Sequence, residues 1–177
     1  MDEHTTPPTP DAIEAAIGNL VEDIANRHNQ TESLAIIGIA NGGIALAQSL
    51  RKRIGEKLGC KIPTGSVDIA FHRDDIARNP IPKISSPTDI PVEVDGADII
   101  LVDDVIYTGR SVRAAINELF DIGRPNRIEL AVLYDRGGRK LPMRPDYCAF
   151  VRKHTDDHQV EITLDPENPQ NHAITVS

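Results

Sequence analysis

Two adjacent carboxylates and a small polar loop mark residues 100–116, whose sequence is ILVDDVIYTGRSVRAAI. Asp103 and Asp104 directly follow four apolar residues, and residues 108–111 precede a run with helical spacing. Carboxylates accept hydrogen bonds from sugar hydroxyls or hold Mg²⁺ through water. Gly109 lets the backbone approach a ligand, and backbone N–H groups at a helix start bind anions, above all phosphate. The corner therefore suits a phosphorylated sugar, with a capped turn and solvated aspartates as the alternative.

Short apolar runs alternate with helical stripes along the chain, which predicts an α/β fold with a mainly parallel sheet and right-handed crossovers. The apolar runs predict strands at 34–39, 67–71, 98–102, 128–134, 147–151 and 160–164. The stripes predict helices over 11–24, 44–58 and 112–120. In such a sheet ligands bind beyond the carboxyl ends of the strands, which is where Asp103 and Asp104 are expected.

The whole chain, residues 1–177, is expected to form one domain. Residues 1–10 and 166–177 are polar, and we predict that they are flexible tails. Residues 73–95 have no sustained period and include four prolines, which excludes a regular helix or an interior strand. This segment is predicted to be a flexible lid or a β-ribbon loop.

Composition favours an ordinary globular protein, with 40% hydrophobic residues, 26% charged residues and a net charge of −8. The polar, acidic start does not resemble a signal peptide, and no stretch is apolar enough to span a bilayer. Cys60 and Cys148 are expected to be reduced, and we predict a cytoplasmic location without membrane partners.

The basic run formed by residues 51–53 and Lys57 is either a nucleic-acid patch or a solvated helix face, and the net negative charge favours the solvated face.

The segment LVDDVIYTGRSVRAAI resembles the signature with which type I phosphoribosyltransferases bind phosphoribosyl diphosphate (PRPP). The continuation FDIGRPNRIELAVLYDRGGRKLPMRPDY is similar to the PyrR family of pyrimidine operon regulators and uracil phosphoribosyltransferases. Further matches are GIANGGIALA at 38–47 and FHRDDI at 71–76. The resemblance implies a type I phosphoribosyltransferase fold with a small hood. It also implies an enzyme that converts uracil and PRPP, with Mg²⁺, to UMP and pyrophosphate.

The resemblance also implies roles for single residues. Asp103 and Asp104 would bind the ribose hydroxyls and hold Mg²⁺ through water, and Arg73 would contact the pyrophosphate. Loop 40–43 would use its backbone for the pyrophosphate. The residues implied to bind substrate are Asn41, Gly42, Val105, Ile106, Tyr107, Thr108, Gly109, Arg110, Ser111 and Arg136. For Arg136, which would border the site from the next strand end, a surface salt bridge is the alternative.

Two positions differ from the family pattern. Gly42 lies where many members carry an arginine, and residues 148–153 read CAFVRK where many have a Val-Gly-Lys-Asn-like hood segment. Two other functions therefore remain open. One is a UMP-sensing regulator that binds a pyrimidine mRNA leader with little catalysis, and the other is a phosphoribosyltransferase for another base. Relatives commonly form dimers or larger assemblies, which implies a homo-oligomer.

Overall fold

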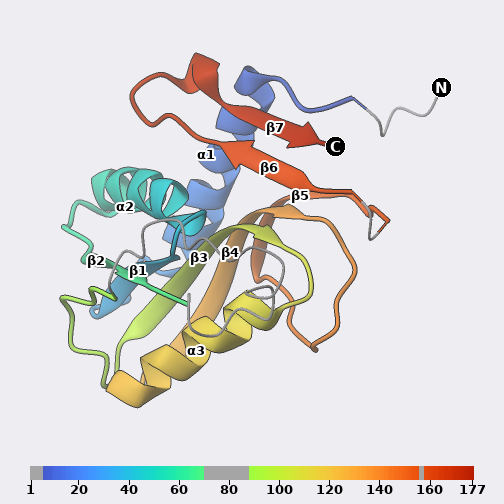
Figure 1. The fold of residues 1–177 in the computed structure, drawn as a ribbon. Helices are drawn as coiled ribbons and strands as arrows, with labels where there is room; N and C mark the ends of the chain where they lie inside the picture. The colour runs from blue at the N-terminus through green and yellow to red at the C-terminus, as the bar shows by residue number, and fades with distance from the viewer. Residues whose placement is uncertain (1–5, 70–87, 156–157) are drawn as a thin grey trace.

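The computed structural model describes residues 6–69, 88–155 and 158–177, and its centre is a parallel five-stranded sheet in the order β2-β1-β3-β4-β5 (Figure 1). The elements are α1 (Pro10–Arg27), β1 (Leu34–Ile39), α2 (Gly43–Leu58), β2 (Thr64–Val67), β3 (Asp98–Ile106), α3 (Arg110–Ile122), β4 (Arg127–Asp135), β5 (Tyr147–Val151), β6 (Val160–Thr163), a 3-10 helix η2 (Pro169–Asn171) and β7 (Ala173–Val176). The predicted α/β class and the helix–strand alternation are confirmed.

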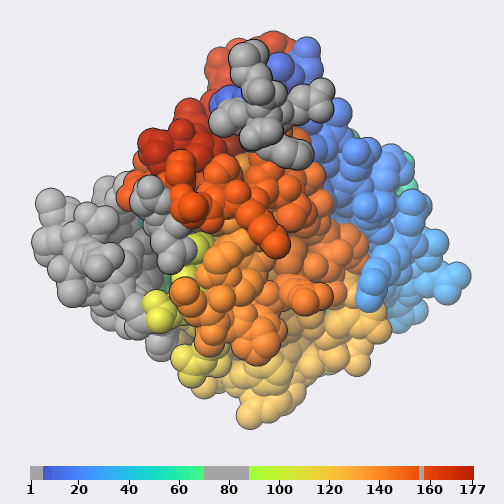
Figure 2. All heavy atoms as spheres, turned by 90° about the vertical axis from the view of Figure 1, so that its right-hand side faces the viewer, coloured from blue at the N-terminus to red at the C-terminus, as the bar shows by residue number. Residues whose placement is uncertain are grey.

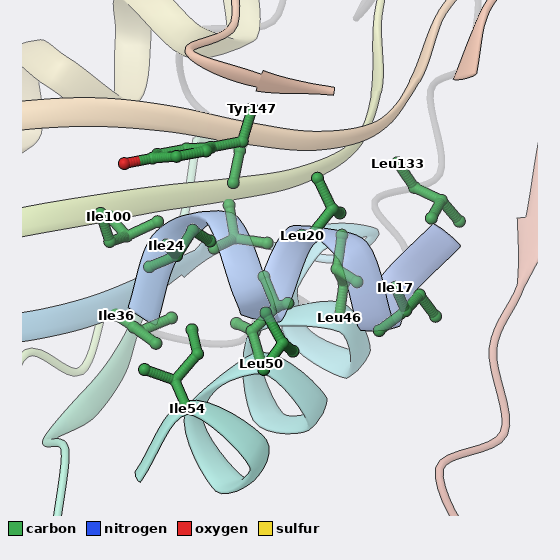
Figure 3. Packing of buried hydrophobic residues seen from close by; sticks show 14 of the residues in the cluster. Ile17, Leu20, Ile24, Ile36, Leu46, Leu50, Ile54, Ile100, Leu133 and Tyr147 are labelled. Carbon is green, nitrogen blue, oxygen red and sulfur yellow. The ribbon is translucent and has the colours of Figure 1, made fainter. Parts of the chain in front are cut away.

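Helices cover both faces of the sheet because each central strand is apolar on both sides. Alternate residues of a strand point to opposite faces, so Ile36 and Ile100 join the cluster under α1 and α2. Their neighbours Ile37 and Leu101 join the cluster under α3. Figure 3 shows the first cluster, in which α1 and α2 contribute Ile17, Leu20, Ile24, Leu46, Leu50 and Ile54.

Strand β3 differs from its predicted range in a way that matters for the aspartates. The strand was predicted to end at residue 102, but it continues to Ile106. Pairing with β1 stops at the Gly38–Val102 pair, whereas pairing with β4 continues to the Ile106–Asp135 pair. Because β1 turns away into α2, Asp103 and Asp104 lie beyond the carboxyl end of one neighbour while the other still supports them.

The second predicted strand, 67–71, is also shifted. Strand β2 covers Thr64–Val67 and pairs with β1 through Thr64 opposite Ile36, and residues 70 and 71 lie outside the described residues. Strand β2 lies at the edge of the sheet and does not need apolar residues on both faces. Its residues Thr64, Gly65 and Ser66 therefore form no apolar run, and the sequence pattern did not indicate a strand there.

The carboxyl-terminal segment forms a small hood and is not a flexible tail as predicted for 166–177. Strand β7 pairs antiparallel with β6, with Ile162 opposite Ile174 (Figure 1). Ile174 is buried in the cluster of α1 and α2, and this burial holds the segment in place. At the other end of the chain, the Thr9 hydroxyl caps α1 by accepting the Ala12 amide at 3.3 Å.

Residues 73–87 of the predicted lid lie outside the described residues, but 88–95 are described. Asp89 forms an antiparallel bridge with Ser66, in which each amide donates to the partner carbonyl at 2.8 Å. The Thr88 hydroxyl accepts the Asp68 amide at 3.1 Å, and Val94 is buried. The described end of the segment is therefore fixed to β2, which places the base of any ribbon or lid at residue 88.

Candidate functional site

The aspartate pair lies at the carboxyl edge of the sheet and is oriented by main-chain amides. Oδ1 of Asp103 accepts the Asp104 amide at 3.0 Å, and Oδ1 of Asp104 accepts the Val105 amide at 2.7 Å. Asp103 is buried and Asp104 is partly exposed. Each carboxylate oxygen has two lone pairs, so the bond to the Val105 amide leaves Asp104 with further acceptor capacity. The pair thus presents carboxylate oxygens at this edge, which are the acceptors that the predicted contact with a diol requires.

Loop 40–43 packs directly against the aspartates, which brings together two segments that are about sixty residues apart in the sequence. A Cβ atom at Gly42 would lie 2.4 Å from the Asp104 carboxylate atoms. A Cβ atom at Gly43 would lie 2.1 Å from the carbonyl oxygen of Val102. The peptide between Ala40 and Asn41 is cis. A side chain at 43 would clash with the main chain, and one at 42 would require the Asp104 carboxylate or the loop to move. The glycine found at position 42 in place of an arginine therefore accompanies a close approach of loop and carboxylate.

Residues 107–111, which we term the phosphate loop, lead from β3 into α3. Gly109 has φ +90° and is the N-cap of the helix, a conformation that glycine adopts without strain. The Thr108 hydroxyl accepts the Arg110 amide at 3.3 Å, and Ser111 is exposed in the first helical turn. Amides of a first turn have no partner within the helix and carry the positive end of its dipole. The loop therefore has the main-chain geometry that an anion site requires, and the binding of an anion here stays a prediction.

The segment after β4 forms an outer wall of the phosphate loop, at residues 139–143. The amides of Lys140 and Leu141 both donate to the Thr108 carbonyl at 3.0 Å. The guanidinium of Arg139 donates to the Tyr107 carbonyl at 2.6 Å. A Cβ atom at Gly109 would lie 3.2 Å from Met143 Cβ, so the wall packs closely. We did not predict a role for Arg139 from the sequence, although it belongs to the DRGGR segment that contains Arg136.

Arg136 supports Tyr107 and is not the surface salt bridge considered as its alternative. Its side chain is buried, and its guanidinium carbon lies 4.0 Å from the centroid of the Tyr107 ring. Nη2 donates to the Thr155 carbonyl at 3.1 Å, which joins the phosphate loop to the segment leading to the hood. A Cβ atom at Gly138 would lie 2.3 Å from Tyr107 Cε2. Tyr107 thus contacts both Arg136 and the backbone at Gly138 closely.

The remaining predicted site residues have different outcomes. Val105 donates its amide to Asp104, while Ile106 is buried and its carbonyl accepts the Arg136 amide at 3.2 Å. Arg73 lies outside the described residues. The structure therefore brings loop 40–43, the aspartate pair and the phosphate loop to one corner, and the role of Arg73 stays a prediction.

A separate cavity of about 580 Å³ lies beside the hood. Figure 2 shows the face on which the orange segment that includes β5 meets the red carboxyl-terminal strands. The described lining of the cavity includes Pro7, Tyr134, residues 151–154 and Ile174, but neither the aspartate pair nor the phosphate loop. The Tyr134 hydroxyl lies 2.8 Å from Nε2 of His154. Burial lowers the pKa of His154, as do the nearby charges of His158 and the arginines, so the ring is mainly neutral at pH 7. The hood segment that departs from the family pattern thus lines this cavity.

Half of the basic run on α2 is engaged with α1. Nη1 of Arg53 lies 2.9 Å from Glu14 Oε1, and Nζ of Lys57 lies 2.6 Å from Glu22 Oε1. Two of the four cations are therefore neutralised within the molecule, which favours the solvated-face interpretation over a nucleic-acid patch. Among the residues that the structure describes, no helix has the length and apolar character needed to cross a membrane.

Comparisons with known proteins agree with this geometry. The family model for the phosphoribosyl transferase domain matches residues 9–164. The chain is 40% identical over 170 residues to the bifunctional protein PyrR of Listeria monocytogenes. The aligned region covers 94% of this chain and 92% of that protein. It is 46% identical over 138 residues to the bifunctional protein PyrR of Halalkalibacterium halodurans, with 77% of each chain covered.

Solved structures show the same fold at low sequence identity. The hypoxanthine phosphoribosyltransferase of Trypanosoma cruzi superposes with a TM-score of 0.68 at 16% identity, covering 95% of this chain and 93% of that one. The hypoxanthine phosphoribosyltransferase of Staphylococcus aureus superposes with a TM-score of 0.65 at 18% identity, covering 82% and 75%. These structural similarities show a shared fold. The family relationship rests on the 40% and 46% sequence identity to the two PyrR proteins.

Proposed function

This chain belongs to the PyrR family of phosphoribosyltransferases, and we propose that it transfers the phosphoribosyl group of PRPP to uracil, giving UMP and pyrophosphate. The observation that carries the proposal is the single corner formed by loop 40–43, the aspartate pair and the phosphate loop. It offers acceptors for a ribose next to main-chain donors for the phosphate attached to it.

Asp103 and Asp104 accept hydrogen bonds from the 2′ and 3′ hydroxyls of the ribose. The amides of the phosphate loop hold the 5′-phosphate at the start of α3, with the hydroxyls of Thr108 and Ser111 as further donors. Fixing the sugar at both ends leaves C1 as the part that moves toward the base. Positioning of this kind supplies much of the rate of a group transfer, because the entropy of alignment is lost on binding.

The bond from the ribose C1 to pyrophosphate breaks ahead of the formation of the bond from C1 to uracil. Positive charge therefore develops on the ribose and negative charge on the departing pyrophosphate. The aspartate pair would lie beside the first charge, and the amides of residues 41–43 would serve the second, while the Ala40 amide donates to the Val67 carbonyl at 2.9 Å. Arg73 adds a cation for the pyrophosphate. No nucleophile from the protein is needed, since uracil itself attacks C1. Water competes with the base, and closure of the segment before residue 88 would exclude it.

The residues at the corner fit a Mg²⁺ ion that arrives with the substrate. In residues 6–69, 88–155 and 158–177, no group of three or more His, Cys, Asp or Glu side chains forms a metal site. Mg²⁺ keeps several waters and is commonly held by one or two carboxylates plus substrate phosphates. Asp103 and Asp104 would supply the carboxylates through water. When bound, the ion would neutralise charge on the pyrophosphate.

A panel of bases incubated with PRPP and Mg²⁺ tests the proposal directly. We expect pyrophosphate release with uracil and the appearance of UMP, with at most slow turnover of orotate, hypoxanthine or guanine. Release with a purine and not with uracil would replace the base in this proposal, and no release with any base would reject catalysis.

A second activity is suggested by the relatives, which are named bifunctional at 40% and 46% identity. We propose that the protein also binds a pyrimidine mRNA leader when UMP occupies the corner. Binding through phosphate contacts weakens steeply with salt. A gel-shift titration with the leader should show a UMP-dependent, salt-sensitive complex, and a scrambled RNA of equal length serves as the control. Identical binding with and without UMP would reject nucleotide-dependent regulation.

We further propose that the protein works in the cytoplasm as a homo-oligomer, as its family implies. Light scattering of the purified protein tests the second point, and a concentration-independent monomer mass would reject it.

A further inference from the structure

We propose that Arg139 is a positioning residue for PRPP: it holds the phosphate loop in the orientation that turns the loop amides toward the substrate. This inference rests on the proposed function, since it concerns the same corner. Arg139 lies outside the set of residues that the family pattern pointed to, and it acts through the main chain and not on the reacting atoms.

The guanidinium of Arg139 joins three segments with charge-assisted hydrogen bonds. Nη1 donates to the Tyr107 carbonyl at 2.6 Å, and Nε donates to the Met143 carbonyl at 2.9 Å. Nη2 lies 2.6 Å from Oδ2 of Asp135 at the end of β4, where the ion pair fixes the plane of the group. The side chain is only 21% exposed, so these bonds are partly shielded from water. A planar guanidinium with five N–H donors can reach these three acceptors at once, whereas the compact ammonium group of lysine does not offer donors in this fixed plane.

The direction of these bonds determines where the amides of the phosphate loop point. A trans peptide is planar, and its C=O and N–H groups point in opposite directions. The only cis peptide among the described residues joins Ala40 and Asn41. Arg139 captures the carbonyl of Tyr107, while the amides of Lys140 and Leu141 capture the carbonyl of Thr108. The N–H groups of Thr108 and Gly109 must therefore face away from the outer wall.

This orientation prepares the loop for an anion before the anion binds. Carbonyl oxygens pointing inward would repel a phosphate, and turning them outward during binding would use part of the binding energy. Donors that are already aimed at the ligand need no such reorganisation. Gly109 contributes by accepting φ +90° with Met143 packed against it. Removing Arg139 should allow the peptide between Tyr107 and Thr108 to rotate, which weakens the grip on the 5′-phosphate.

The test compares Arg139→Gln with the wild type and with Arg144→Gln, which removes the same charge from an exposed site five residues further on. We expect Arg139→Gln to raise KM for PRPP on the order of tenfold, while kcat and KM for uracil change less than about threefold. Arg144→Gln should match the wild type. Arg139→Lys, which keeps the charge but not the three-way geometry, should give an intermediate KM for PRPP. Binding of UMP, followed by ³¹P NMR, should weaken in the same order.

The outcomes separate this inference from the proposed function. A wild type that forms no UMP would reject the function, whereas an active wild type with equal KM values in the two Gln variants would reject only the role of Arg139. A loss of kcat alone, or equal losses for PRPP and uracil, would indicate a general structural effect and overturn the inference. If Arg139→Gln does not fold, Asp135→Asn removes the carboxylate that aims the guanidinium. That variant should raise KM for PRPP selectively, and an unchanged KM would again overturn the inference.

Discussion

Gly42 lies so close to Asp104 that a Cβ atom at position 42 would come within 2.4 Å of the carboxylate. Loop 40–43 and the aspartate pair are therefore in direct contact, and the position of one sets the position of the other. The glycine found where many relatives carry an arginine is part of this contact. A side chain here could reach the substrate only if Asp104 or the loop moved.

Gly42→Ala should displace the Asp104 carboxylate or the loop and lower kcat/KM for PRPP by roughly 10- to 100-fold, because small misplacements are costly in group transfer. Gly18→Ala in α1 is the matched control, since its Cβ would meet only Arg53 Nη2 at 3.5 Å. It should leave activity unchanged and raise the free energy of unfolding by about 0.5–1 kcal/mol, as expected for glycine in a helix. Steady-state kinetics and urea unfolding distinguish the two, and an unimpaired Gly42→Ala enzyme would contradict the contact's importance.

Asp104→Asn should impair uracil-dependent pyrophosphate release through weaker ribose contacts and loss of negative charge beside C1. We expect a decrease in kcat/KM of at least about 100-fold, with the fold retained because Asn Oδ1 can still accept the Val105 amide. Asp121→Asn removes a charge from an exposed site on α3 and should have no effect. Equal activity in both variants would remove Asp104 from the proposed mechanism.

A buried polar cluster at the opposite end of the sheet predicts an acid-dependent loss of stability. Glu129 accepts from Tyr147 Oη at 2.7 Å and lies 2.8 Å from His28 Nε2, with Arg27 at 2.7 Å and Arg127 at 3.3 Å. Burial raises the pKa of Glu129, but the hydrogen bonds and cations outweigh it, and the net pKa lies below its ordinary value of 4.5. The stabilisation is therefore complete above the ordinary pKa and is lost as pH falls through the lowered one.

Glu129→Gln should lower the free energy of unfolding at pH 7 by about 3 kcal/mol, because it leaves buried partners without their charge. The difference from the wild type should shrink as the pH falls below the ordinary glutamate pKa. Urea titrations at pH 7 and in this acid range measure both effects, and Glu32→Gln at an exposed position is the control. A difference that does not depend on pH would show that the pKa of Glu129 is the same in the folded and the unfolded protein, which contradicts a lowered pKa.

Shortening the predicted lid should affect turnover more than PRPP binding. The antiparallel bridge between Ser66 and Asp89 shows that a deletion must end before residue 88 to keep the base of the segment. Replacing residues 76–86 by a short glycine linker should sharply lower UMP formation and increase uracil-independent hydrolysis of PRPP, since water is no longer excluded. Isothermal titration should find PRPP binding mostly unchanged. Normal turnover in this variant would refute the lid.

The two cysteines should differ in reactivity. Burial and the neighbouring Asp135 raise the pKa of the Cys148 thiol to about 11, whereas Cys60 is exposed. Thiolate is the reactive form, so at pH 8 an aromatic disulfide reagent should titrate one thiol quickly in the folded protein and both in urea. Cys60→Ser should abolish the fast phase. Two fast thiols in the native protein would contradict the partial burial and the raised pKa of Cys148.

Much of this architecture could be predicted from the sequence because it depends on local patterns. Apolar runs such as 34–39 and 128–134 predict strands, and a helical stripe after Gly109 predicts α3. The doubled aspartate and the glycine turn predict a sugar-phosphate corner, because their chemistry is a property of adjacent residues. These features need no knowledge of how distant segments meet. The strands and the helix are confirmed, and the binding of a sugar phosphate stays a prediction.

Tertiary structure alone decided the rest, because contacts between distant segments leave no periodic signal in one sequence. The continuation of β3 beyond the aspartates depends on its pairing with β4, and the order in residues 166–177 depends on the burial of Ile174. The contact of Gly42 with Asp104 requires β1 and β3 to be neighbours. Arg139 donates to the carbonyl of Tyr107, which is 32 residues earlier in the chain. Every residue type has a main-chain carbonyl, so no sequence pattern can reveal such a hydrogen bond.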